Sequence, residues 1–199
     1  MTLLQIWDIF GTFVFCVSGA IAARRNGMDW FGMFVVGLVT GTGGGMLRSI
    51  LIGDLPPPFL RSPGYLSAAL LATVFAVVGD SLWEKVRRIV SVIDALGIGI
   101  FVVTGIRIAQ DHGFPPWAAL VLGVISATFG GLLRDVLRNE VPLILRREIY
   151  ATACIAGGLL LFLLDAMGAS NAVAVSLSTL SVAAIRLLAI RYSIHQSGQ

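Results

Sequence analysis

Charged residues are scarce in this sequence. Asp, Glu, Lys and Arg make up 13% of its 199 residues, whereas a soluble domain carries about 25%. With 57% hydrophobic residues and a mean hydropathy of +0.90, the chain has too few charges to cover the surface of a water-soluble monomer. We therefore expect a membrane protein, because a lipid bilayer removes the need for that cover.

Histidine and cysteine are also rare. His112 and His195 fall in a predicted loop and in the C-terminal tail, whereas Cys16 and Cys154 fall inside apolar segments. Cysteines in such segments are typically small packing residues rather than a disulfide or a metal pair. Without a buried His–nucleophile pair or a His/Cys/carboxylate cluster, the sequence predicts no enzyme activity and no resident metal or cofactor.

No Lys or Arg precedes the first apolar run of the chain. A cleaved signal peptide begins with a basic leader, so we expect the first apolar segment to be retained as a membrane span. The 14 basic residues lie mostly in short loops between apolar segments. This distribution is typical of membrane orientation rather than of a nucleic-acid-binding surface, and no nucleic-acid partner is expected.

Long hydrophobic runs account for most of the chain. A transmembrane helix needs about 20 mostly apolar residues, and seven such segments are separated by charged breaks or by breaks with Pro and Gly. The predicted spans are residues 6–23, 30–51, 64–83, 90–109, 116–137, 149–167 and 171–190. The sequence thus predicts an all-α membrane protein with seven transmembrane helices and a tail at residues 191–199.

The basic residues of the predicted loops gather on one side of the membrane. The loops after the first, third and fifth spans share that side with the C-terminus, because the chain crosses an odd number of times. That side holds Arg24, Arg25, Lys85, Arg87, Arg88, Arg138, Arg146, Arg147 and Arg191, and the other side holds Arg61 and Arg107. Because positive loops stay inside, we expect a cytoplasmic C-terminus and an outside N-terminus in the plasma (inner) membrane.

The chain repeats itself at a shift of 86 residues. Of the 49 positions from 8 to 56, 16 are identical to the position 86 residues later, including Asp8 with Asp94 and Arg48 with Arg134. Each copy holds three spans, an odd number, so the second copy must be inverted in the membrane. We therefore predict a first repeat at 1–83, an inverted second repeat at 90–167 and a seventh helix at 171–190.

Three consecutive glycines interrupt the second predicted span. Gly43, Gly44 and Gly45 each cost about 1 kcal/mol relative to alanine in a helix, and they point about 100° apart around it. They predict that this helix is kinked or opened here, with freed backbone lining a cavity. Gly130 and Gly131 predict the same for the fifth span. The alternative is that small residues on one face let another helix approach closely.

Oxygen atoms at the two glycine sites are candidate ligands for a permeant ion. Thr42 and Thr128 add hydroxyl groups there, and a broken helix exposes carbonyl groups that suit a cation. We predict a transient cation site near Thr42, Gly43, Thr128 and Phe129.

Arginines follow the glycines in both copies. A guanidinium group inside a span costs several kcal/mol unless it is paired or wet, and it marks a functional site. We expect Arg48 to pair with Asp135 across the repeat axis, because neighbours such as Arg134 and Asp135 do not face each other on a helix. Arg48, Arg134 and Asp135 are the predicted charged gate. The alternative is that each arginine extends along its span end to the headgroups.

Four further polar residues are secondary candidates. Asp8 and Asp94 open the first and fourth spans, where the helix dipole favours a carboxylate. Ser18 and Thr104 lie deeper in the same spans, where a hydroxyl can bond to the backbone. Ser49 follows the first arginine at the position that Asp135 occupies in the second copy.

Charged residues near other span ends complete the set. We expect Arg107 and Arg186 to reach the headgroups from their span ends. We expect Asp165, at the end of the sixth span, to be solvated. None of these three is predicted to belong to the gate.

Three segments of the chain resemble the prokaryotic TRIC family of trimeric intracellular cation channels. They are residues 11–19, 43–53 and 130–137, and the last two hold the glycines and arginines described above. Bacterial members of this family are also described as putative glycine transporters. The resemblance implies a homotrimer in membrane lipid whose protomers each hold a pore, with K⁺ and possibly Na⁺ as the permeant ion. The family motif reads Arg-Asp in both copies, whereas this chain has Arg48-Ser49 in the first copy; Phe129 also replaces the first glycine in the second.

Two functions remain open from the sequence. A monovalent cation channel is the first, with a pore through the repeat interface of each protomer. A secondary transporter for a small neutral solute such as glycine is the alternative, because transporters also use broken helices in inverted repeats.

Overall fold

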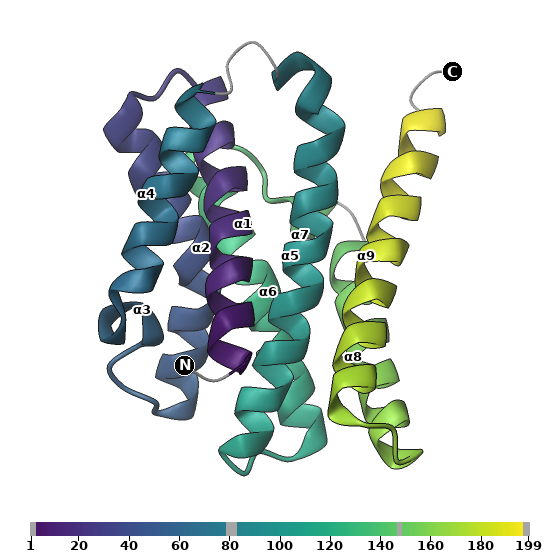
Figure 1. Cartoon of the computed structure of the whole chain (residues 1–199). Helices are drawn as coiled ribbons and strands as arrows, with labels where there is room; N and C mark the ends of the chain where they lie inside the picture. The colour runs from purple at the N-terminus through teal and green to yellow at the C-terminus, as the bar shows by residue number, and fades with distance from the viewer. Residues whose placement is uncertain (1–2, 79–82, 147–148, 197–199) are drawn as a thin grey trace.

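The computed structural model describes residues 3–78, 83–146 and 149–196, with side chains at 5–78, 94–145 and 149–191. These residues form nine helices and no strand (Figure 1). In chain order the helices are α1 (Leu3–Arg25), α2 (Trp30–Ile52), α3 (Pro58–Arg61), α4 (Pro63–Val78), α5 (Trp83–Asp111), α6 (Pro116–Leu137), α7 (Leu143–Arg146), α8 (Ile149–Ala166) and α9 (Asn171–Gln196). The predicted all-α architecture is therefore confirmed.

Five of the helices are long and apolar enough to cross a membrane. They are α1, α2, α6, α8 and α9, and α4 is a shorter apolar helix of 16 residues. The fourth predicted span began at residue 90, but α5 is already helical from Trp83 onward. The predicted loop at 84–88 is thus wrong, because the helix extends beyond its apolar stretch. The end of the third predicted span, at 79–82, lies outside the described residues.

Local sequence signals account for the boundaries of α2. The side chain of Asp29 accepts a hydrogen bond of 2.7 Å from the Gly32 amide and so satisfies one free donor of the first turn. Gly53 ends the helix in the left-handed region, with φ at 77°, where a residue without Cβ is favoured. The α6 helix begins at Pro116, a residue that tolerates the first helical position.

The helices of the two halves correspond at the shift of 86. The α2 helix begins at residue 30 and α6 at 116, and α4 begins at 63 and α8 at 149. In Figure 1, α1 rises from the end where the chain starts, whereas its counterpart α5 descends beside it. Phe15 and Phe101, which are also 86 positions apart, meet between these two helices with ring centroids 5.1 Å apart.

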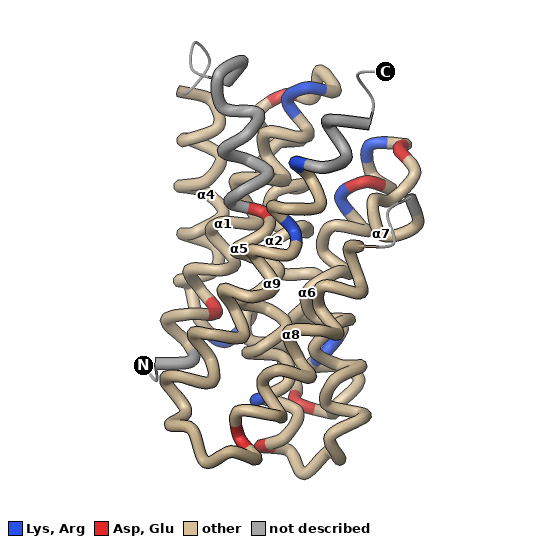
Figure 2. Tube along the Cα trace, turned by 90° about the vertical axis from the view of Figure 1, so that its right-hand side faces the viewer, with Lys and Arg blue, Asp and Glu red and all other residues tan. Residues whose placement is uncertain are grey.

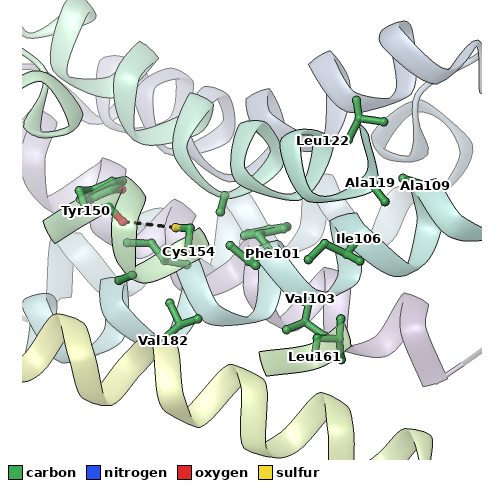
Figure 3. Close-up of a cluster of buried hydrophobic side chains, with 14 of the residues drawn as sticks. Phe101, Val103, Ile106, Ala109, Ala119, Leu122, Tyr150, Cys154, Leu161 and Val182 are labelled. Carbon is green, nitrogen blue, oxygen red and sulfur yellow. Dashed lines mark hydrogen bonds between the residues drawn. The ribbon is translucent and has the colours of Figure 1, made fainter. Parts of the chain in front are cut away.

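Two apolar clusters fill the interior of the described residues. The larger lies between α5, α6, α8 and α9 and includes Ile106, Leu122, Leu161 and Val182 (Figure 3). The smaller lies between α1, α2 and α4 around Cys16. Many large apolar side chains face outward instead, as the surface of a bundle in lipid requires.

Candidate functional site

The backbones of α2 and α6 touch at two glycines. A Cβ atom added at Gly44 would lie 1.9 Å from the carbonyl oxygen of Ser126, and one added at Gly130 would lie 2.0 Å from that of Thr40. Both distances are far below any real contact, so only glycine fits at either place. Gly44 and Gly130 correspond at the shift of 86, as do Thr40 and Ser126, and the two contacts therefore repeat one arrangement.

The glycines do not open either helix. The α2 helix is continuous from Trp30 to Ile52 and α6 from Pro116 to Leu137. The prediction of an opened helix at Gly43–Gly45 and at Gly130–Gly131 is therefore wrong. The alternative of close helix approach explains Gly44 and Gly130, because tight packing there compensates for the poor helix propensity of glycine. A bend within the continuous helices stays a prediction.

The other glycines of these stretches have different surroundings. A Cβ at Gly43 would lie 2.9 Å from the Leu133 side chain, whereas one at Gly45 would meet nothing closer than Arg48 Nη2 at 3.8 Å. A Cβ at Gly131 would lie 3.1 Å from the Tyr150 hydroxyl. Within the first triplet, the helix contact thus requires glycine at position 44 but leaves space beside Gly45.

The hydroxyl groups of the two threonines each donate a hydrogen bond to a carbonyl of their own helix. Thr42 Oγ1 donates to the Leu38 carbonyl at 2.7 Å, and Thr128 Oγ1 donates to the Val124 carbonyl at 2.8 Å. Both residues are buried and Phe129 is half-buried. Since only the hydroxyl hydrogens are used, both oxygens keep lone pairs for a further partner. The cation site predicted around them stays a prediction.

Arg134 is the centre of a buried charged network. It lies in the last turn of α6, and its Nη1 atom donates to Ser18 Oγ of α1 at 2.9 Å and to Asp94 Oδ1 of α5 at 3.2 Å. Its Nε atom donates to Asp135 Oδ1 at 2.9 Å. Ser18 also donates to Asp94 at 3.3 Å. All four side chains are buried, so these contacts are shielded from water and screened little by salt.

Asp135 also anchors the segment that follows α6. Its Oδ2 atom accepts a hydrogen bond of 3.0 Å from the amide of Leu143, the first residue of α7. The expected pair of Arg48 with Asp135 is therefore wrong. Neighbours on a helix do diverge at Cβ, but the long side chain of Arg134 turns back so that Nε reaches the adjacent carboxylate.

Arg48 is buried without an ion pair among the described residues. It is 1% exposed, so the alternative of an extension to the headgroups is wrong. Its Nη1 atom donates to Ser126 Oγ of α6 at 3.2 Å, and its Nε atom has no partner within the described part of the chain. Ser49 beside it is fully buried, with a hydroxyl that also has no partner there.

Asp8 and Asp94 do not cap helices. The α1 helix begins at Leu3 and α5 at Trp83, so both carboxylates lie inside a helix, and each is only 7% exposed. Asp94 belongs to the Arg134 network, and Asp8 Oδ2 accepts a hydrogen bond of 2.6 Å from the Tyr65 hydroxyl of α4. The sequence analysis missed Tyr65, because a tyrosine in an apolar run carries no signal of its partner.

The second half contains further polar contacts. Thr104 donates to the Ile100 carbonyl at 2.9 Å, as expected for a hydroxyl within a span. Arg186 is 5% exposed and lies over the Tyr150 ring, 4.4 Å from its centroid, a cation–π contact. Its predicted extension to the headgroups is wrong, and Tyr150 was also missed from the sequence.

Arg107 forms two hydrogen bonds to Asp165, at 2.7 and 2.8 Å. Arg107 therefore does not extend to the headgroups as an unpaired side chain, and the Asp165 carboxylate is not free in solvent. Elsewhere, the described residues contain no group of three or more His, Cys, Asp or Glu side chains that could hold a metal ion.

Comparisons with known proteins match nearly the whole chain. A family model described as "Glycine transporter" matches residues 5–81 and 91–166. A UPF0126 membrane protein of Vibrio cholerae is 38% identical over 197 residues, which cover 97% of this chain and 81% of that protein. The inner membrane protein YadS of Escherichia coli K12 is 40% identical over 162 residues, which cover 79% of this chain and 77% of YadS.

Solved structures share the fold. The TRIC trimeric intracellular cation channel orthologue from Rhodobacter sphaeroides is 37% identical, with a TM-score of 0.91 over 97% of this chain and 100% of that one. A second TRIC cation channel is 34% identical, with a TM-score of 0.85 over 96% of this chain and 95% of that one. With its apolar helices, this chain is a multi-pass membrane protein.

Proposed function

The chain belongs to the TRIC family, and we propose that it is a channel for monovalent cations, chiefly K⁺, in the inner membrane. The observation that carries the proposal is the likeness to a solved cation channel at a TM-score of 0.91 and 37% identity. The buried charged network that joins α1, α5 and α6 adds to it, because charges inside a membrane bundle mark ion pathways.

The proposed arrangement has seven spans, formed by α1, α2, α4, α5, α6, α8 and α9, in two inverted repeats and a closing helix. Its support is the correspondence of helix starts at the shift of 86. Figure 2 shows more Lys and Arg in the upper half of the molecule, where the chain ends, than in the lower half. This bias favours a cytoplasmic C-terminus and an outside N-terminus.

The proposed pore runs along the α2–α6 crossing of each protomer, past the hydroxyl oxygens of Thr42 and Thr128. We assign the gate to the Arg134 network, which joins α1, α5 and α6. An arginine repels K⁺, but Asp94 and Asp135 outnumber its charge, so the network as a whole does not oppose a cation. In the described state the Arg134–Asp94 ion pair holds α6 to α5, and opening requires that Arg134 exchange at least one carboxylate partner.

The proposed assembly is a homotrimer with one pore in each protomer, surrounded by lipid. The TRIC orthologue from Rhodobacter sphaeroides is described as trimeric, and this chain shares its fold over nearly its whole length. The outward-facing apolar side chains are suited both to lipid and to contacts between protomers.

A transporter for a small neutral solute such as glycine is the second candidate, favoured by the description of the matching family model. Purified protein in planar bilayers with K⁺ and Na⁺ gradients separates the two. We expect discrete current steps with a reversal potential set by the cation gradient. Silent bilayers together with saturable glycine uptake into proteoliposomes would refute the channel proposal and support the transporter.

A further inference from the structure

The equivalent carboxylates of the two halves, Asp8 and Asp94, have different partners. Asp94 of α5 contacts Arg134 at 3.2 Å. At the corresponding positions of the first half, Arg48 does not pair with Asp8 but donates to Ser126 at 3.2 Å. Among the residues that the structure describes, Asp8 therefore has no ion-pair partner, although the repeat carries an arginine to match.

The carboxylate of Asp8 is left with an unused oxygen. The residue is 7% exposed, and Oδ2 accepts the Tyr65 hydroxyl at 2.6 Å. Its Oδ1 atom is buried and has no hydrogen-bond partner in the described part of the protein. A buried charge without compensation costs several kcal/mol, so an acceptor of this kind needs a partner that the chain itself does not supply.

A small cavity lies beside this carboxylate. Its volume is about 10 Å³, and Asp8, Thr12, Thr42 and Tyr65 line it together with Gly41, Gly45 and apolar side chains. This space is close to what one water molecule needs. A K⁺ ion is of similar size, so the cavity admits one cation without its hydration shell.

Two threonines that line the cavity carry further oxygens of the kind that suits a cation. Thr12 Oγ1 donates to the Asp8 carbonyl at 2.8 Å, and Thr42 Oγ1 donates to the Leu38 carbonyl at 2.7 Å. Because each hydroxyl hydrogen is committed to the backbone, each oxygen can offer only lone pairs to the cavity. Hard cations bind carboxylate and neutral oxygen ligands of this kind.

We propose that this cavity, the Asp8 pocket, binds one monovalent cation, with Asp8 Oδ1 as the charged ligand and Thr12 and Thr42 as neutral ligands. The inference rests on the proposed function, because it names an ion site for the channel. Asp8 lies near the start of α1, whereas Arg134 lies in the last turn of α6. The first half thus binds a cation at the carboxylate whose equivalent in the second half pairs with an arginine.

Thallium binding tests the Asp8 pocket, since Tl⁺ resembles K⁺ in charge and size and scatters anomalously. We expect an anomalous peak in the pocket of wild-type crystals soaked in Tl⁺, and its loss in Asp8→Asn. The control Asp165→Asn changes a carboxylate outside both the pocket and the Arg134 network and keeps the peak. In solution, we expect Asp8→Asn to weaken Tl⁺ affinity by at least tenfold.

Thr12→Val keeps the inference testable if Asp8→Asn does not fold. Valine has the shape of threonine without its hydroxyl, so the helices still pack and we expect a weaker Tl⁺ peak. A peak unchanged in Asp8→Asn, or a wild-type pocket that holds only water, would overturn the inference.

The outcomes separate the inference from the proposed function. A Tl⁺ peak in a protein that gives silent bilayers supports the site while the channel proposal fails. Cation currents with an empty wild-type pocket overturn the site and leave the channel proposal intact.

Discussion

Replacing Gly44 by alanine tests whether the α2–α6 contact determines the stability of this fold. The added Cβ would lie 1.9 Å from the Ser126 carbonyl oxygen, where an ordinary contact is 3.4–4 Å. The two helices would have to separate by about 1.5 Å to restore that distance. No rotamer change can relieve the clash, because the atom opposite belongs to the backbone.

The adjacent position is a matched control. A Cβ at Gly45 meets nothing closer than 3.8 Å, so Gly45→Ala gains the helix propensity of about 1 kcal/mol without a clash. Gly44→Ala gains the same propensity but adds an overpacking cost of about 3 kcal/mol, the upper end of the usual range. We therefore expect the two variants to differ in free energy of unfolding by about 3 kcal/mol, or roughly 100-fold in the folding equilibrium.

Unfolding in mixed micelles of a mild detergent and increasing dodecyl sulfate, followed by circular dichroism, measures this difference. Gly130→Ala should be destabilised like Gly44→Ala, because its Cβ would lie 2.0 Å from the Thr40 carbonyl oxygen. If Gly44→Ala proves as stable as Gly45→Ala, the close backbone contact between α2 and α6 does not exist and the reasoning fails.

Three further predictions concern the gate, the orientation and the assembly. Asp135→Asn should change open probability at least about tenfold, because it weakens the contacts to Arg134 and to the start of α7. The control Asp165→Asn lies outside the network and should leave single-channel currents near wild type. Equal effects of the two variants would refute the gate. Arg25→Cys should react with an impermeant thiol reagent only from the cytoplasm and Asp111→Cys only from outside, whereas reversed labelling would invert the topology. Native mass measurement in mild detergent should give the mass of three chains, and a stable monomer or dimer would contradict the trimer.

Much of the fold was predictable because its signals are local or repeated. Apolar runs of membrane length marked the helical segments, since any lipid-facing backbone must satisfy its hydrogen bonds within a helix. The repeat at a shift of 86 pointed to Arg48, Arg134 and the glycines as special positions before any contact was known. The arginines were also recognisable as special positions because a charge in an apolar run is costly.

The glycines show where local reasoning is misleading. Helix propensity predicted that Gly43–Gly45 would open α2, but α2 is continuous there. Propensity describes an isolated helix, whereas Gly44 lies against the Ser126 carbonyl of another helix. The contact partner is 82 positions away in the chain, and no local pattern reveals it.

The sequence alone determined which segments are helical and apolar and which of their residues carry charge, because hydrophobicity and residue type are properties of the chain itself. Only the tertiary structure decided the partners. Arg134 contacts Asp94 and Ser18, and Tyr65 contacts Asp8, across separations of 40, 116 and 57 positions. The two repeats carry matching arginines, yet of Arg48 and Arg134 only Arg134 forms an ion pair among the described residues, because each guanidinium binds whichever acceptors the packed helices bring within its reach.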